Sequence, residues 1–229
     1  MNFLQLCQRA RRRCRVTGTG PTTVIGQNEE YARLVDYTNE AWMIIQRKRP
    51  DWKWMRNTAT FPVVAGQAEY TLAQIESTGS GFSNFGNWAQ DSFRNYPTGV
   101  TAQEMFMDQI GYENWRNTYL YSTNRTTTSR PIELAETPSH GLALGPVPAT
   151  GYTILGDYYK VASEMALDAD EPALDDQFHM AIVYGVMMLY GAAEAAPEVF
   201  DVGQMLYNQI MNEMERFYLP ELEDLEPLA

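Results

Sequence analysis

The stretch NTATFPVVAGQAEYTL, residues 57–72, is where the residue pattern of the chain changes from helical to extended. Residues 58–64 are rich in threonine, valine and phenylalanine, Gly66 marks a turn, and residues 68–72 resume the extended pattern. This arrangement predicts two short strands joined by a hairpin-like loop. Pro62 lacks a backbone donor, so the first strand is expected at the edge of a sheet.

Amphipathic helical patterns precede this stretch. Apolar residues recur every three or four positions between Phe3 and Cys14, and the arginines of this segment fall on the remaining surface. A second helix is expected from about Asn28 until Pro50 stops it. Its apolar stripe consists of Tyr31, Leu34, Val35, Thr38, Trp42 and Ile45.

Strands and then helices follow the stretch. Further strands are expected near 103–109, 131–136, 141–146 and 152–161, and a short helical segment is expected at 112–120. Two final helices are expected at about 175–193 and 198–219, on either side of Pro197. The fold class predicted is α+β and mainly α: an antiparallel bundle of about four helices with a small inserted antiparallel β-domain and an extended C-terminal arm.

The expected domain organisation is a helical bundle formed by 1–56 and 172–219, a β-rich insertion at 57–171, and a C-terminal arm at 220–229. Within the insertion, residues 73–99 are rich in glycine, serine and asparagine, as in a flexible loop, yet they also include aromatic residues. This composition predicts a loop that docks on a partner through Phe82, Phe85, Trp88, Phe93 and Tyr96.

Charge is distributed unevenly along the chain. The formal net charge is -12, yet residues 1–60 hold eleven of the 17 Lys and Arg residues against five Asp and Glu residues, a net +6. The remaining residues therefore carry -18. This asymmetry predicts neighbours of opposite charge. The densest basic cluster contains Arg9, Arg11, Arg12, Arg13 and Arg15.

Neither export nor membrane insertion is expected. The first residues lack the order of charged and apolar residues found in a secretory signal. The longest uncharged apolar run, Met180–Ala193, is shorter than the roughly 20 residues that cross a bilayer. Cys7 and Cys14 would lie about 10 Å apart on one helix, too far for a disulfide, so reduced thiols and a reducing cytoplasm are expected.

Candidates for catalysis or metal binding are weak. The acidic stretch Asp168–His179 resembles a calcium loop in composition, but Pro172 and Ala173 occupy its fifth and sixth positions, and the sixth requires glycine. Ser139 and His140 are neighbours in a turn, unlike a nucleophile elbow. No enzyme, metal or cofactor is therefore expected. A hydrolase with paired carboxylates is the alternative, because sequence spacing does not reveal such a pair.

Six segments, taken together in their order and spacing, resemble the head-to-tail adaptor (connector) proteins of tailed bacteriophages. They are residues 1–9, 17–42, 51–72, 142–148, 152–172 and 178–200. The first helix is richer in arginine than the family pattern and segment 79–99 is longer, so family contacts are not carried over to these two regions.

The resemblance implies a structural virion protein that forms a twelve-fold ring beneath the portal. Such a ring, assembled in the host cytoplasm and located in the virion neck, extends the DNA channel and provides the platform for a tail or nozzle protein. Double-stranded DNA would pass through it during genome ejection without specific contacts. A net acidic chain suits this passage, because each phosphate contact would add affinity and hold the DNA.

Roles are expected for three groups of residues, the first two from charge and composition and the third from the resemblance. The five arginines are expected on the outer surface, facing carboxylates of a neighbouring subunit or of the portal; a solvated face and direct DNA contact are the alternatives. The aromatic residues of 73–99 would face a tail component or an adjacent subunit. Related adaptors place their C-terminal segments against the portal, which implies portal or neighbour-subunit binding by Pro220, Leu222, Leu225, Pro227 and Leu228.

Overall fold

The computed structural model describes residues 1–121 and 123–218, which divide into two compact units. One unit contains Met1–Met55 together with the chain from Ala162 onward, and the other contains Arg56–Val161. The described residues form a mixed α+β fold with six α-helices and several antiparallel sheets, so it is not a simple four-helix bundle. Within the described residues, every strand lies in the second unit.

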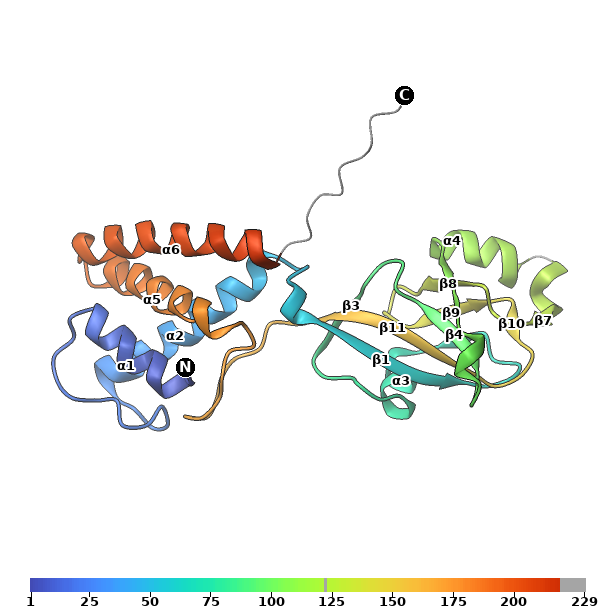
Figure 1. Cartoon of the computed structure of the whole chain (residues 1–229), viewed down its shortest axis with the longest axis horizontal. Coiled ribbons are helices and arrows are strands. Elements are labelled where there is room, and N and C mark those ends of the chain that lie inside the picture. The colour runs from blue at the N-terminus through green and yellow to red at the C-terminus, as the bar shows by residue number, and fades with distance from the viewer. Residues whose placement is uncertain (122, 219–229) are drawn as a thin grey trace, which may run out of the picture. The chain divides into compact units, whose positions relative to one another are not determined.

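The first, helical unit is built on four long helices (Figure 1). They are α1 (Phe3–Arg13), α2 (Glu29–Lys48), α5 (Met180–Ala193) and α6 (Pro197–Tyr218). Helix α5 is apolar nearly all round because it packs against each of the other three. Close packing with α6 depends on small residues: a Cβ atom at Gly191 would lie 2.6 Å from the Phe200 nitrogen. Short 3₁₀ turns at Lys53–Met55 and Asp176–Phe178 complete the unit.

The second, β-rich unit contains eleven short strands within the described residues. They are β1 (Arg56–Val63), β2 (Glu69–Tyr70), β3 (Phe85–Trp88), β4 (Arg94–Pro97), β5 (Met105–Phe106), β6 (Asp108–Gln109), β7 (Thr128–Ser129), β8 (Glu133–Glu136), β9 (Leu142–Gly145), β10 (Val147–Pro148) and β11 (Tyr152–Lys160). Helices α3 (Leu72–Thr78) and α4 (Tyr112–Trp115), a 3₁₀ turn at Thr101–Gln103, a π-helical turn at Arg116–Leu120 and a 3₁₀ turn at Thr123–Thr126 lie between strands.

The strands form two main sheets. One has the order β1-β11-β4-β5, with β3 also paired to β11, and the other has the order β2-β9-β8-β6. Strands β1 and β11 are antiparallel along their whole length, from Arg56 opposite Tyr159 to Val63 opposite Tyr152. The pairs β6–β8 and β7–β10 are parallel.

The structure corrects the expected hairpin at residues 57–72. Strand β1 lies at the end of its sheet, as Pro62 predicted, but its partner is β11. Strand β2 contains two residues and pairs with β9 in the other sheet. The turn at Gly66 is present, but it connects two sheets rather than two paired strands.

The aromatic segment 73–99 also differs from the expected flexible loop. It contains most of α3 and all of β3 and β4, and four of its aromatic side chains, all except the half-buried Tyr96, form part of the apolar core of the β-rich unit. Phe93 is fully buried, Trp88 is 3% exposed, and Phe82 and Phe85 pack beside them. These side chains are held within their own unit, so Trp88 and Phe93 offer no surface for docking.

An irregular segment after β11 belongs to the helical unit. Gln46 exchanges two hydrogen bonds with the backbone of Ser163, at 2.9 and 3.1 Å. Asn39 does the same with Met165, at 2.9 and 3.0 Å. These amides satisfy backbone groups that have no strand partner. The sequence predicted that the helical bundle resumes at residue 172. These hydrogen bonds explain why the helical unit resumes at Ala162 instead.

Candidate interaction surfaces

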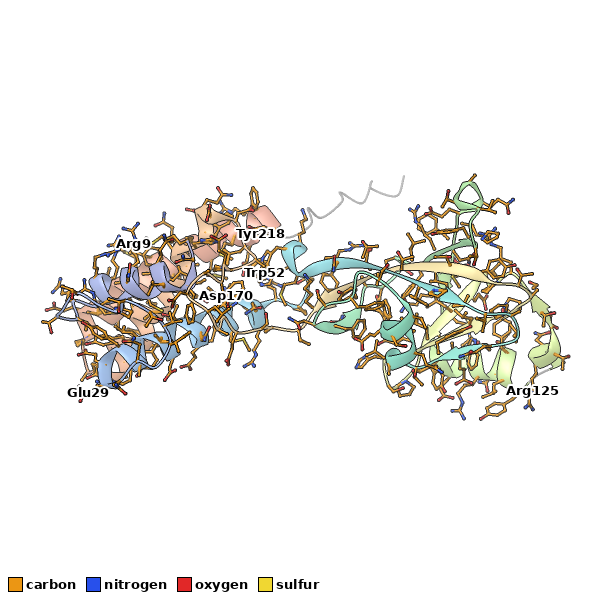
Figure 2. The ribbon with its side chains drawn as sticks, turned by 90° about the horizontal axis from the view of Figure 1, so that it is seen from below. Arg9, Glu29, Trp52, Arg125, Asp170 and Tyr218 are labelled. Atoms are coloured by element: carbon orange, nitrogen blue, oxygen red, sulfur yellow. The ribbon has the colours of Figure 1, made fainter. Side chains whose placement is uncertain are left out.

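Helix α1 separates an apolar face from an arginine face. The Asn2 side chain accepts a hydrogen bond from the Gln5 backbone while the Gln5 side chain accepts one from Asn2, forming a capping box that fixes the helix start. Phe3, Leu6, Cys7 and Ala10 are buried. The opposite face exposes Arg9, Arg12 and Arg13, and Arg15 follows the helix; Figure 2 shows Arg9 on the outside of the helical unit.

The five arginines do not share one role. Arg11 is half-buried and donates to the backbone oxygens of Val16 and Gly18, which closes the loop after α1. Arg15 lies 3.7 Å from Glu198 at the start of α6. Arg9, Arg12 and Arg13 have no ion pair with any described residue. These three cations are therefore available to a partner.

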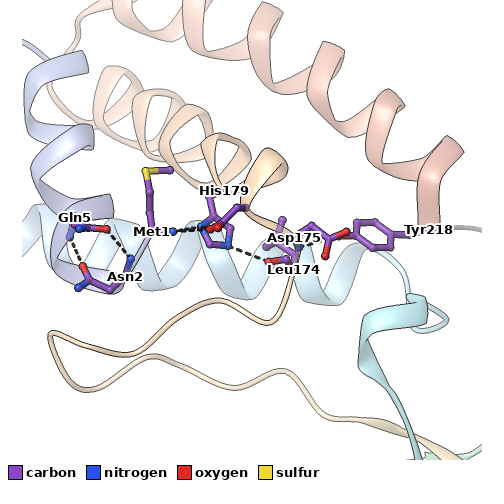
Figure 3. A network of polar contacts seen from close by, with 8 residues as sticks. Met1, Asn2, Gln5, Leu174, Asp175, His179 and Tyr218 are labelled. Atoms are coloured by element: carbon purple, nitrogen blue, oxygen red, sulfur yellow. Dashed lines mark hydrogen bonds and ion pairs between the residues drawn. The ribbon is translucent and has the colours of Figure 1, made fainter.

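The buried His179 side chain belongs to a polar network at the start of α5 that extends to the surface at Asp176 (Figure 3). Its Nε2 lies 2.9 Å from the Leu174 carbonyl oxygen, and its Nδ1 lies 2.5 Å from the Met1 ammonium, which also lies 2.8 Å from an Asp176 oxygen. A carbonyl requires a donor, so Nε2 carries the proton and Nδ1 accepts from Met1. Both nitrogens of this imidazole are occupied, and His179 has no free nitrogen for proton transfer.

Burial lowers the pKa of His179 from its ordinary value of 6.5. The unfolded chain therefore binds a proton at higher pH than the folded chain, and the stability from a neutral His179 is lost as pH falls below about 6.5. We expect the free energy of unfolding in urea to decrease below that pH by up to about 1.4 kcal/mol per pH unit. The His179→Gln variant should flatten this decrease, whereas the exposed-site control His140→Gln should retain it. An unchanged slope in His179→Gln would contradict the assignment.

The acidic stretch Asp168–His179 is used for internal contacts. One oxygen of Asp168 accepts from the Val24 backbone at 2.6 Å and from the Thr23 hydroxyl at 3.1 Å. Asp170 accepts from two backbone amides, which lowers the pKa of its carboxyl group. Among the described residues, no group of three or more potential ligands is arranged to hold a metal ion.

The residues considered for catalysis are separated or paired with other groups. The His140 ring lies 2.6 Å from Glu136, and the Ser139 hydroxyl lies 3.3 Å from that of Thr137. Glu136 and Asp91 line a cavity of about 360 Å³. Asp91 is exposed and Glu136 lies beside His140, so neither carboxylate lies in an apolar pocket like that of a glycosidase general acid.

An apolar groove between α2, α5 and α6 was not identified from the sequence. It has a volume of about 80 Å³. The sequence contained one indication of this groove: Ile44 is apolar but lies off the apolar stripe of α2. In the structure its side chain is 45% exposed. The C-terminal residues Pro220, Leu222, Leu225, Pro227 and Leu228, which were assigned a binding role from sequence, lie outside the described residues.

Comparison with known proteins points to one family. Residues 1–222 match the family model described as SU10 adaptor protein. None of the curated proteins matches this sequence. Across 1–121 and 123–218, no helix has the length and apolar character needed to span a bilayer.

Proposed function

Since this chain belongs to the SU10 adaptor protein family, a family of structural proteins of the phage neck, we propose that it forms the head-to-tail adaptor ring beneath the portal. Twelve copies would extend the DNA channel and provide the platform for a tail or nozzle protein. The observation that carries this proposal is the family match over residues 1–222.

A closed ring of identical chains requires two different contact faces on each subunit. The unpaired arginines of α1 supply one such face. Helix α6 exposes Asp201 and Glu213, neither of which forms an ion pair with a described residue. We infer that the arginine face meets carboxylates, either of this kind on the next subunit or on the portal.

The test of the ring is direct imaging and size measurement. The purified chain, mixed with isolated portal, should form a twelve-fold ring on the portal end in cryo-electron microscopy. A chain that stays monomeric and does not bind portal would contradict the proposal. Hydrolytic turnover by that monomer would favour the carboxylate-dependent enzyme instead.

Assembly on portal should weaken as salt rises, because exposed ion pairs are screened with a Debye length of about 3 Å at 1 M salt. Replacing Arg12 and Arg13 with glutamate should reduce ring occupancy at low salt, whereas Arg125→Glu, an exposed change in the β-rich unit, should not. Analytical ultracentrifugation across a salt series measures both effects. If the occupancy of the ring on portal is the same at low salt and at about 1 M salt, the electrostatic contact is excluded, but formation of the ring is not.

The C-terminal segment is the second proposed contact. Pro220 and Pro227 limit helix formation, and leucines recur every third residue between carboxylates in LPELEDLEPLA. Short peptides with an apolar edge commonly bind in an ordered form to a partner. We propose that Pro220, Leu222, Leu225, Pro227 and Leu228 contact the portal or the neighbouring subunit in the assembled neck.

A further inference from the structure

The apolar groove of the helical unit has the size and lining of a site for one aliphatic side chain. Its volume of about 80 Å³ is well below the roughly 150 Å³ of an apolar cavity that accepts benzene. Three helices line it with almost entirely apolar atoms, through Ala41, Ile44, Gly185, Met188, Leu189 and Tyr207.

Two side chains at this groove lack a favourable contact: one is apolar and exposed to solvent, and the other has a buried hydroxyl without a hydrogen bond. Ile44 on α2 is 45% exposed. The hydroxyl oxygen of Tyr207 is buried and has no hydrogen-bond partner among the described residues. A buried hydroxyl without a partner is destabilising, and a backbone carbonyl of an inserted segment would supply an acceptor for it. The occupant expected is therefore a peptide with an apolar side chain.

The rim of the groove is basic towards the C-terminal end of α2. Arg47 and Lys48 follow Ile44 by three and four positions, so they lie on the same face of the helix. Lys48 lies 3.3 Å from Glu215, while exposed Arg47 has no ion pair with a described residue. An acidic peptide that leaves the groove in this direction would pass these two cations.

Helix α6 ends at Tyr218, beside this basic rim. The rings of Trp52 and Tyr218 are 6.1 Å apart, edge to face (Figure 2). Lys48 of the rim lies 3.3 Å from Glu215, three residues before Tyr218, so the last described residue lies at the same end of the unit as the rim. Tyr207 lies eleven residues earlier in α6, about 16 Å back along the helix axis. Seven extended residues cover about 23 Å, so Leu225 can reach the groove from Tyr218.

We propose that residues 219–229 of the free subunit fold back on their own helical unit, with Leu225 in the groove and Glu221, Glu223 and Asp224 beside Arg47 and Lys48. The tether favours the chain's own segment over that of another copy, because it gives the segment a local concentration in the millimolar range. The inference concerns the subunit before assembly and does not depend on the portal. Portal binding by the same leucines would then compete with this intramolecular site.

Disulfide cross-linking of the free, full-length chain tests the proposal. The variant Ile44→Cys with Leu225→Cys should form an intramolecular disulfide under copper–phenanthroline oxidation, identified as a linked peptide in a monomer by mass spectrometry. Native Cys7 and Cys14 should stay out of the reaction, because burial raises their pKa to about 11 and about 12. Arg47→Glu in the same background should slow the cross-link severalfold.

The matched control is Met205→Cys with Leu225→Cys. Met205 is 63% exposed and lies two positions before Tyr207, on roughly the opposite side of α6. Its cross-link should form about tenfold more slowly than that of the Ile44 pair, as expected if docking sets the local concentration. Equal rates, no Ile44–Leu225 link, or a link found only in disulfide-bonded dimers would each overturn the proposal; the last would assign the groove to a second copy. Far-ultraviolet circular dichroism confirms that each variant is folded.

Discussion

Replacing Trp88 with alanine should lower the free energy of unfolding of the β-rich unit by about 3–5 kcal/mol, the usual cost of removing a large buried aromatic side chain. The Trp88 ring centroid lies 4.9 Å from that of Phe85 and 5.2 Å from that of Phe93. Its Nε1 donates to the His140 carbonyl oxygen at 2.9 Å. The substitution would open a cavity in this aromatic core and leave that oxygen without its partner.

Urea denaturation followed by circular dichroism measures this loss. The matched control is Phe106→Ala in the same unit, since Phe106 is 58% exposed and its main contact is the guanidinium group of Arg94, 4.0 Å above the ring. That contact is worth about 0.5–1 kcal/mol at an exposed site. A Trp88→Ala variant as stable as the Phe106→Ala variant would show that Trp88 is not part of the core.

Deleting residues 220–229 should abolish stable binding to portal while leaving the helical content of the subunit unchanged. The described elements end at Tyr218, so the deletion removes no residue of α6. Surface plasmon resonance on immobilised portal would measure the loss. Equal binding by the truncated and intact chains would contradict a portal contact by this segment.

Two point-variant sets separate apolar from charged contributions within the segment. Serine at Leu222, Leu225 and Leu228 should reproduce the deletion, because these leucines provide the apolar edge. Glutamine at Glu221, Glu223 and Glu226 should weaken binding less and mainly reduce its salt dependence. The opposite ranking would assign recognition to the carboxylates.

Local patterns predicted the long helices well because each has a clear apolar face or a defined stop. They did not predict strand pairing, since β1 and β11 are far apart in sequence and their register depends on the whole unit. The glycines of 73–99 indicated a loop, but several serve packing. A Cβ atom at Gly81 would lie 2.4 Å from the Thr58 carbonyl oxygen, and one at Gly86 would lie 2.7 Å from that of Tyr159.

The candidate surfaces were predictable to a similar degree. Helical spacing placed the arginines away from the apolar face of α1, and four of the five are exposed. It did not reveal that Arg11 closes the following loop, because a side-chain bond to Gly18 depends on the course of that loop. The groove at Ile44 also could not be inferred, since it requires three helices from distant parts of the chain.

The discontinuity of the helical unit has a consequence for the order of folding. Packing of α5 and α6 on α1 and α2 requires the two ends of the intervening 56–161 segment to come together. Pairing of β1 with β11 brings those ends into register, with Arg56 opposite Tyr159. After this pairing, packing of the helices closes a loop of only a few residues instead of the whole segment. This lowers the entropic cost of loop closure by about 2–3 kcal/mol. Formation of the β-rich unit before the helical unit should therefore accelerate assembly of the helices.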